Sequence, residues 1–295
     1  MMRALRSQVL LMIRQGIHMD SPDMQRNIKQ YILEAIRADP RIVGCVDYGS
    51  TSEGRGDVWS DLDIALFIED SELELFQKDW KQWASQFGHL LLAYIGGVGH
   101  PWVVYDTDPV PLRVDFAFHP ASTLNRVLKW PNSPTSADAM VWLDRTDGEL
   151  TTFVSQLVGQ SLAPNNLAQA FEQVCGDFWY YFLRTHAKLT RGESWGARYD
   201  FNSIITGNLF ALLRIESGAI DRWRGSSASA GIEKVLSEKR RTQLDQCIPG
   251  PSKTDLRFAM FQAGLLGYEA SEQIAQKYSW DWPISLSKKV LRIYR

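Results

Sequence analysis

The spacing of hydrophobic residues changes near residue 151, and this change constrains the fold more than any other feature of the sequence. Before it, short apolar segments alternate with polar positions, as in half-buried strands. After it, apolar residues recur every three or four positions over long segments, as on one face of a helix. The sequence therefore predicts an α+β fold, in which a domain with a mixed β-sheet flanked by helices (1–150) precedes a helical-bundle domain (151–295).

The first half is expected to begin with a helix at 22–38, since Ser21-Pro22-Asp23 has the character of a helix start and Pro40 stops the pattern. A second helix is expected at 71–87. Strands are expected in the six segments RIVGCVDYGS, DLDIALFIED, HLLLAYI, PWVVYD, LRVDFAF and MVWLD. In the second half, helices are expected at 165–192, 197–217, 231–246, 253–278 and 284–294, with a flexible connection at 217–231.

The net charge of -2 conceals an asymmetry between the two halves. Residues 1–150 contain 14 lysines and arginines against 21 acids, whereas residues 151–295 contain 18 against 13. An acidic half suited to metal ions and a basic half suited to phosphates are what a nucleotide site between two domains needs, although ordinary solubility charge gives the same balance. The slightly acidic chain disfavours nucleic acid as a partner.

The cysteines and the N-terminal residues indicate the cellular compartment in which the protein is expected. Cys45, Cys175 and Cys247 lie far apart and form no Cys-x-x-Cys pair, which argues against a disulfide framework or a zinc site and favours a reducing cytoplasm. Residues 1–20 are too short to span a bilayer and lack a signal-peptide cleavage site. We interpret them as an N-terminal extension, such as an additional helix, with a transit peptide as the alternative.

The segment YGSTSEGRGDVWSDLDIALF combines a phosphate-binding turn with a pair of carboxylates. Gly49 lets a backbone approach a phosphate closely, and the amide and hydroxyl of Ser50 can donate hydrogen bonds to it. Side chains alternate along a strand, so Asp61 and Asp63 point to the same face and can share a hard divalent cation. The segment therefore predicts a nucleotide site next to a metal site.

This motif resembles that of the DNA polymerase β-type nucleotidyltransferase superfamily, in which a hydrophobic-Gly-Ser turn precedes an Asp-hydrophobic-Asp-hydrophobic strand by about ten residues. The similarity covers residues 42–68. It implies a nucleotidyltransferase domain that binds Mg²⁺, with two ions expected, and uses a nucleoside triphosphate such as ATP as co-substrate.

The resemblance also implies a third carboxylate on a neighbouring strand, and LRVDFAF offers Asp115. A carboxylate inside an apolar strand is costly unless it faces a metal or a cationic partner, although a strand-edge Asp that reaches solvent is the alternative. Asp61 and Asp63 are then shared metal ligands. Asp115 either holds the second ion or takes the acceptor proton, and the sequence does not separate these roles.

The first helix expected in the second half presents a row of cations. Arg184, Lys188 and Arg191 follow a spacing that places them on one helix face, which suits a triphosphate or an ordinary solvated surface. The segment also resembles the helical domain of the aminoglycoside and lincosamide nucleotidyltransferases. That similarity implies a nucleotide-binding role for the cations and a role for Glu193, with Asp177 as an alternative, in orienting or deprotonating an acceptor hydroxyl.

The leading hypothesis is transfer of AMP from ATP to a hydroxyl of a small molecule of the aminoglycoside type, with release of pyrophosphate. A lincosamide, a protein side chain or an RNA end are alternative acceptors. A non-catalytic nucleotide-binding or antitoxin-like module is the alternative of another class, but such a module has no need to keep three repulsive acids together.

Overall fold

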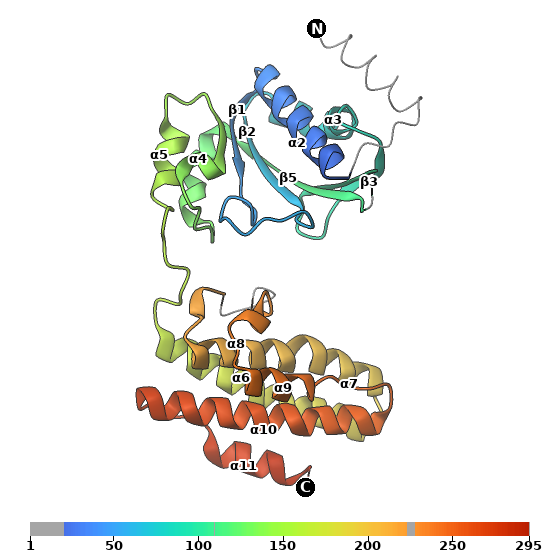
Figure 1. Ribbon diagram of the computed structural model, residues 1–295, viewed down its shortest axis with the longest axis vertical. Coiled ribbons are helices and arrows are strands. Elements are labelled where there is room, and N and C mark those ends of the chain that lie inside the picture. The colour runs from blue at the N-terminus through green and yellow to red at the C-terminus, as the bar shows by residue number, and fades with distance from the viewer. Residues whose placement is uncertain (1–20, 109, 223–227, 295) are drawn as a thin grey trace. The chain divides into compact units, whose positions relative to one another are not determined.

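The computed structural model describes residues 21–108, 110–222 and 228–294 (Figure 1). The predicted N-terminal extension and part of the predicted connection at 217–231 lie outside these residues. The chain divides into two compact units between Gln160 and Ser161, rather than between residues 150 and 151 as the periodicity suggested. None of the described helices has the length and apolar character needed to cross a membrane.

The first unit is built on a mixed sheet of six strands in the order β3-β4-β5-β2-β1-β6. Each strand falls in a segment where the sequence predicted one. The bounds are β1 Ile42–Asp47, β2 Leu62–Ile68, β3 Leu90–Ile95, β4 Pro101–Tyr105, β5 Leu112–Pro120 and β6 Val141–Asp144. Within the described residues β2 and β5 pair in parallel, and the other neighbours pair antiparallel. The mixed sheet is thus confirmed.

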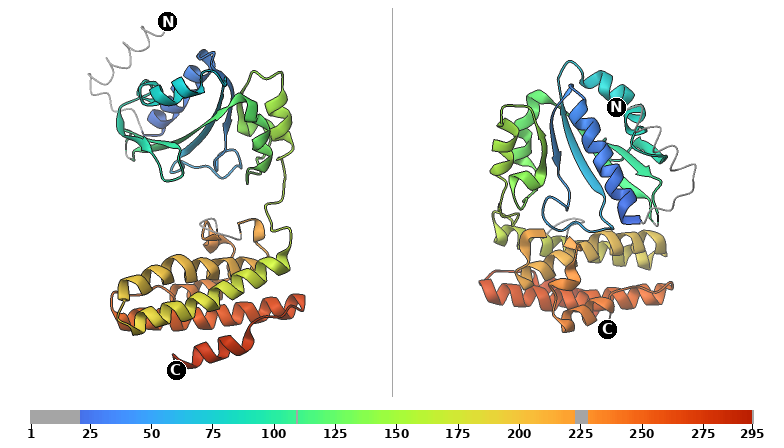
Figure 2. Two further views of the ribbon diagram at one scale, coloured as in Figure 1. Left: turned by 180° about the vertical axis from the view of Figure 1, so that it is seen from behind. Right: turned by 45° about the horizontal axis from the view of Figure 1, so that its top comes forward.

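Helices cover both faces of this sheet (Figures 1 and 2). One face carries α2 (Ser21–Ala38) and α3 (Leu73–Ala84), whose apolar side chains pack on Ile64 and Leu66 of β2. The opposite face carries η1 (Ala121–Lys129), α4 (Ala137–Met140) and α5 (Glu149–Ser155), which pack on Ala65 and Phe67. The alternation of side chains along β2 therefore assigns each residue to one of two apolar clusters.

The short helices η1, α4 and α5 are absent from the sequence predictions, and α5 explains the later boundary. Leu150, Val154 and Leu157 are buried against Val46 of β1. The apolar residues that begin here have helical spacing, but the helix that they form packs on the sheet of the first unit. Periodicity identifies the helix and not the surface that it covers.

The second unit is helical, as predicted. Its elements are α6 Leu167–Thr190, α7 Ser194–Asp200, η2 Phe201–Ile205, α8 Thr206–Ser217, η3 Ile220–Arg222, η5 Ile232–Lys234, α9 Glu238–Asp245, α10 Lys253–Tyr278 and α11 Ile284–Arg292. The helix expected at 197–217 occurs as the consecutive elements α7, η2 and α8, and η2 is a π-helical turn. The helix expected at 231–246 is divided into η5 and α9.

The core of the second unit depends on a close approach of α6 and α10. A Cβ added to Gly267 of α10 would lie 2.5 Å from the ring of Phe178, and one added to Gly264 would lie 3.2 Å from the ring of Phe182. Both phenylalanines are fully buried. Glycine at these positions leaves room for the aromatic rings that fill the core.

Candidate active site

The parallel pairing of β2 and β5 brings the predicted carboxylates together. Asp63 and Asp115 are directly opposite each other in the register of the two strands. Asp61 comes one residue before β2 and, because side chains alternate along an extended chain, points to the same face as Asp63. The neighbouring carboxylates of Asp61 and Asp63 and the distant carboxylate of Asp115 therefore gather at the start of the parallel pair.

The carboxylates interact as like charges. Burial, and then the carboxylates of Asp61 and Asp115, raise the pKa of Asp63 to about 7. Burial and the charge of Asp61 also raise the pKa of Asp115, while the cationic side chain of Arg113 opposes this. A group of acids whose charged forms are disfavoured by one another has the electrostatics of a site for a cation.

Arg113 supplies one positive charge next to this group. Its Nη2 lies 3.0 Å from Oδ2 of Asp61, and the arginine side chain is largely exposed. No three or more histidine, cysteine or acidic side chains in the described part of the chain are arranged to hold a metal ion. The donor set is nevertheless all oxygen, as Mg²⁺ prefers. The magnesium site at Asp61, Asp63 and Asp115 stays a prediction.

The turn after β1 is packed against these acids. A Cβ added to Gly49 would lie 2.2 Å from Oδ2 of Asp63, so the close approach made by this glycine is to a carboxylate. The Gly49 amide donates to Oδ1 of Asp47 at 2.9 Å. Glycine at position 49 is thus required by the contact with Asp63, and the Gly49 amide is already bonded. The phosphate-binding role of Gly49 and Ser50 stays a prediction.

Asp47 is a site residue that the sequence reasoning missed. It is buried, its Oδ2 has no hydrogen-bond partner among the residues that the structure describes, and burial raises the pKa of its carboxyl. Its position at the end of a buried strand, two residues before Gly49, is the signal that could have identified it. Asp47 shapes the turn through its bond to the Gly49 amide.

Residues of a second loop form hydrogen bonds with the backbone of the same turn. The Asn132 side-chain amide donates to the Tyr48 carbonyl at 2.7 Å, and the Thr135 amide donates to the Ser52 carbonyl at 3.0 Å. The Ser52 hydroxyl in turn donates to the Gly49 carbonyl at 2.8 Å. These bonds fix the backbone beside Asp63 without using the side chain of Ser50.

The predicted cations of the second unit have partners of their own. Nζ of Lys188 lies 2.7 Å from the carboxylate of Asp200, which is buried, and Nε of Arg184 lies 3.4 Å from it. Arg191 follows the end of α6 and pairs with Glu193 at 2.7 Å. Sequence reasoning missed Asp200, whose burial becomes visible only once α7 packs on α6.

Glu193 has the electrostatics of an ionised surface acid. The hydrogen bond from Arg191 holds its pKa below the usual range. A carboxylate of this kind can orient a hydroxyl or an amine by accepting a hydrogen bond, and it is a weaker base than a carboxylate with a raised pKa. The predicted role of Glu193 in the reaction is therefore better suited to orientation than to proton removal.

Comparisons with known proteins identify what the chain is similar to. A model of the streptomycin adenylyltransferase family matches residues 24–294. An aminoglycoside 6-adenyltransferase from Bacillus subtilis is 14% identical, with 92% of this chain and 97% of that chain covered and a TM-score of 0.42. A nucleotidyltransferase-like protein from Exiguobacterium sibiricum 255-15 is 12% identical, with 86% and 78% covered and a TM-score of 0.36. No curated protein matches the chain.

Proposed function

Because the chain belongs to the streptomycin adenylyltransferase family and is a nucleotidyltransferase, we propose that it transfers AMP from ATP to a hydroxyl group of an aminoglycoside-type antibiotic. Pyrophosphate is the second product. Such a reaction inactivates an antibiotic by adding a bulky anion, which makes antibiotic resistance the proposed role. A cytoplasmic location accords with the three cysteines, which are buried and free of disulfides.

The observation that carries this proposal is the register of β2 and β5. It places Asp63 opposite Asp115, with Asp61 on the same face and the Gly49 turn against Asp63. The three acids are the proposed ligands of two Mg²⁺ ions, which when bound would neutralise the triphosphate and the charge on the attacking and leaving oxygens. The positive charge of Arg113 partly neutralises Asp61 and so lowers the electrostatic repulsion among the three carboxylates.

The reaction is an in-line displacement at the α-phosphorus of ATP. The acceptor oxygen forms a bond to this phosphorus as the bond to the β-phosphate oxygen breaks, and the leaving group departs as pyrophosphate. The acceptor proton passes to a carboxylate. Asp115, opposite Asp63 in the strand register, is the proposed base, and Glu193 is proposed to orient the acceptor.

The phosphates of ATP require donors from the chain itself. The proposed donors are the Gly49-Ser50 turn, through the amide and hydroxyl of Ser50, and the cations Arg184, Lys188 and Arg191. Lys188 also neutralises the buried Asp200, so a Lys188→Glu variant would place two acids together and damage the fold. Arg191→Gln tests the phosphate role more cleanly, because Arg191 is exposed and its partner Glu193 stays in solvent.

A substrate panel tests the proposed function. The full-length protein is incubated with Mg²⁺, one of four α-labelled nucleoside triphosphates, and streptomycin, another aminoglycoside, lincomycin, tRNA or a protein mixture. Label on an aminoglycoside with ATP as donor is the expected result. Label on lincomycin, tRNA or protein would overturn the acceptor assignment, and absence of transfer to every acceptor would favour the non-catalytic module.

Variants of the carboxylates test the site. Asp61→Asn and Asp63→Asn each remove one charge with little change in volume, and we expect each to lower turnover at least a hundredfold at saturating Mg²⁺. Asp79→Asn on the exposed surface of α3 is the matched control and should leave turnover unchanged. Retention of more than a tenth of wild-type turnover in both site variants would refute the carboxylate assignment.

The cation assignment has its own control. Arg191→Gln should weaken ATP binding about threefold to tenfold in calorimetry, because one charge-assisted contact with a phosphate is lost. Lys288→Gln, an exposed cation of α11, should leave it unchanged. If the two variants bind ATP with equal affinity, Arg191 does not contact the phosphates of ATP.

A further inference from the structure

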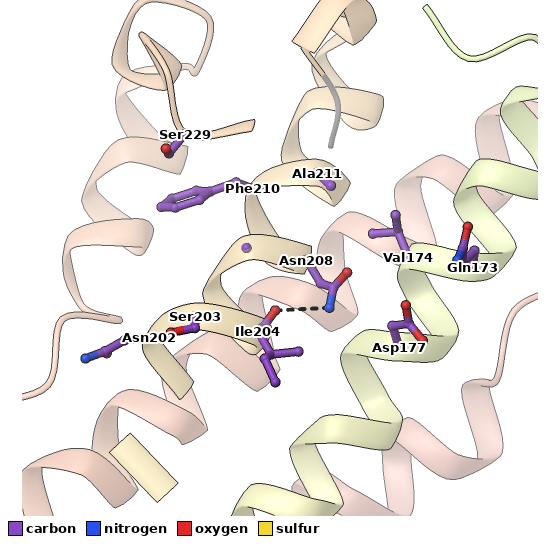
Figure 3. A pocket seen from close by; sticks show the side chains of 11 residues that line it. Gln173, Val174, Asp177, Asn202, Ser203, Ile204, Asn208, Phe210, Ala211 and Ser229 are labelled. Carbon is purple, nitrogen blue, oxygen red and sulfur yellow. Dashed lines mark hydrogen bonds between the residues drawn. The ribbon is translucent and has the colours of Figure 1, made fainter. Parts of the chain in front are cut away.

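The sheet edge at β3 in the first unit differs from a pocket in the second unit in the kind of partner that it fits. The pocket, of about 460 Å³ among α6, η2 and α8, is concave and partly polar, and its size suits a small molecule (Figure 3). The β3 edge is extended and apolar, and such an edge suits another strand. The exposed apolar side chains on this edge and in the turn after it are Leu91, Leu92, Tyr94, Ile95 and Val98, between 41% and 68% exposed.

The backbone of β3 is open on its outer side within the described residues, where β4 is its one neighbour. The Gly96 amide donates to the His100 carbonyl at 2.8 Å, and Ile95 lies opposite Pro101, which has no N–H. Because hydrogen bonds alternate along an antiparallel pair, the N–H and C=O groups of Ala93 and Ile95 point away from β4. The edge therefore offers backbone donors and acceptors to another strand.

The strand β3 lacks the features that usually keep edge strands from pairing. Its segment Leu90–Ile95 contains no charged residue and no proline, and its register with β4 is regular from Leu92 onwards. The opposite edge strand β6 has four residues and ends at Asp144, and Nζ of Lys29 lies 4.7 Å from the ring centre of its Trp142. Short length and nearby charge therefore oppose pairing at β6 and are absent from β3.

We propose that β3 pairs with β3 of a second copy of this chain, in the antiparallel direction and about a two-fold axis at Tyr94. Ala93 of each copy then exchanges backbone hydrogen bonds with Ile95 of the other, and the two Tyr94 side chains lie next to each other on one face of the joined sheet. The same surface of both copies forms the interface, as two-fold symmetry requires. The inference is independent of the proposed reaction.

The charges around β3 favour this antiparallel arrangement. His89 and Asp106 lie at one end of the strand, where Nδ1 of His89 is 3.2 Å from Oδ2 of Asp106. The other end is the uncharged turn at 96–99. A two-fold axis brings the charged end of one copy to the uncharged turn of the other and keeps the Asp106 carboxylates apart. Parallel pairing would place these like charges on the same side.

The edge is held in place within a single copy, so pairing requires little ordering. The rings of Tyr94 and Trp102 are 5.8 Å apart, and a Cβ added to Gly96 would lie 2.3 Å from the Trp102 ring. The apolar side chains form a patch of roughly 300–500 Å² on each copy, so the dimer would bury about 1,000 Å², the lower bound for a specific interface. We expect such an interface to dissociate at roughly 1–100 µM.

Sedimentation equilibrium with the full-length protein tests the dimer. The wild type should associate reversibly to twice the mass of one chain between about 1 and 200 µM. Ile95→Lys should raise the dissociation constant at least about tenfold, because it would place an unpaired ammonium group in an apolar interface. Leu75→Lys is the matched control and should associate as the wild type does, since Leu75 on α3 is 51% exposed and Ile95 is 53% exposed. Circular dichroism establishes that both variants fold.

A disulfide tests the register of the two strands. The native cysteines Cys45, Cys175 and Cys247 are buried, so Tyr94→Cys adds one exposed thiol. Opposite residues of a non-hydrogen-bonded antiparallel pair have Cα atoms about 4.5 Å apart, which is within reach of a disulfide. Tyr94→Cys should therefore form a cross-linked dimer in a glutathione redox buffer, and Leu75→Cys should not. A wild-type dimer whose Tyr94→Cys variant does not cross-link would overturn the axis at Tyr94.

Amide hydrogen exchange distinguishes a second copy from another segment of the same chain. The Ala93 and Ile95 amides should be protected in the dimer and should lose protection on dilution below the dissociation constant. Protection that is equal at every concentration would show that the chain covers its own edge, and the proposal would be wrong. A wild type that stays monomeric at the highest concentration, or a dimer that Ile95→Lys leaves unchanged, would equally overturn it.

Discussion

At the scale of single residues, the close approach of Gly49 restricts the position of the Asp63 carboxylate. In Gly49→Ala the added Cβ would fall 2.2 Å from Oδ2 of Asp63, so Asp63 must move. A displacement of about 1 Å in a reacting site can lower the rate about a hundredfold, and we expect a loss of that size in kcat. Gly97→Ala is the control, because a Cβ there meets nothing within 4 Å. Near-normal kcat in a folded Gly49→Ala protein would contradict the role of Asp63.

His119 of β5 couples stability to pH. Burial, and then the charges of His100 and Arg126, lower its pKa from the ordinary 6.5 to about 4. Between these values the unfolded chain binds more protons than the folded one, so the free energy of unfolding falls as the pH drops from 6.5 to 4. The contribution of this one group approaches ~1.4 kcal/mol per pH unit within the window. Above pH 6.5 it is constant.

Urea unfolding at several pH values between 4.5 and 7 measures this effect. The variant His119→Phe keeps a ring beside Phe67 and Trp130 but does not titrate. Its free energy of unfolding should decline less steeply towards acid than that of the wild type. Parallel pH dependences would show that His119 is protonated equally in the folded and unfolded chains.

At the scale of elements, the packing of α6 on α10 outweighs helix propensity. Alanine favours helices over glycine by about 1 kcal/mol, yet in Gly267→Ala the methyl group would lie 2.5 Å from the buried ring of Phe178. We expect this variant to be less stable than the wild type by about 1–3 kcal/mol, as for other overpacked cores. Thermal or urea unfolding measures the difference.

A glycine of α6 provides the matched comparison for this prediction. A methyl group at Gly176 meets no atom within 4 Å, so Gly176→Ala should increase stability by up to about 1 kcal/mol. Opposite signs for the two substitutions are the expected result. A stabilising Gly267→Ala would contradict the close contact between Gly267 of α10 and the Phe178 ring of α6.

At the scale of the whole molecule, each unit has its own core. The apolar cluster of the second unit is formed by residues 171–291, and those of the first unit by residues 28–157. A domain with its own core can fold alone, so a fragment of residues 161–295 should be helical and unfold cooperatively. Circular dichroism during heating checks this. A fragment without a cooperative transition would show that the second unit requires the first.

The elements of this protein were largely predictable from sequence, because strand alternation and helical spacing are local patterns. The six strands and the long helices occur where these patterns place them, and Asp61 and Asp63 share a face for the same local reason. The short helix α5 shows the limit, since its apolar spacing was visible but its packing against Val46 was not.

Tertiary structure alone decided which distant residues meet. Strand order and register determine that Asp115 lies opposite Asp63 and that Arg113 reaches Asp61, and the sequence only offered these residues as candidates. The packing of α7 on α6 similarly gives Lys188 a buried partner. Contacts between residues far apart in the chain depend on the relative placement of whole elements, and hydrophobic periodicity contains no information on that placement.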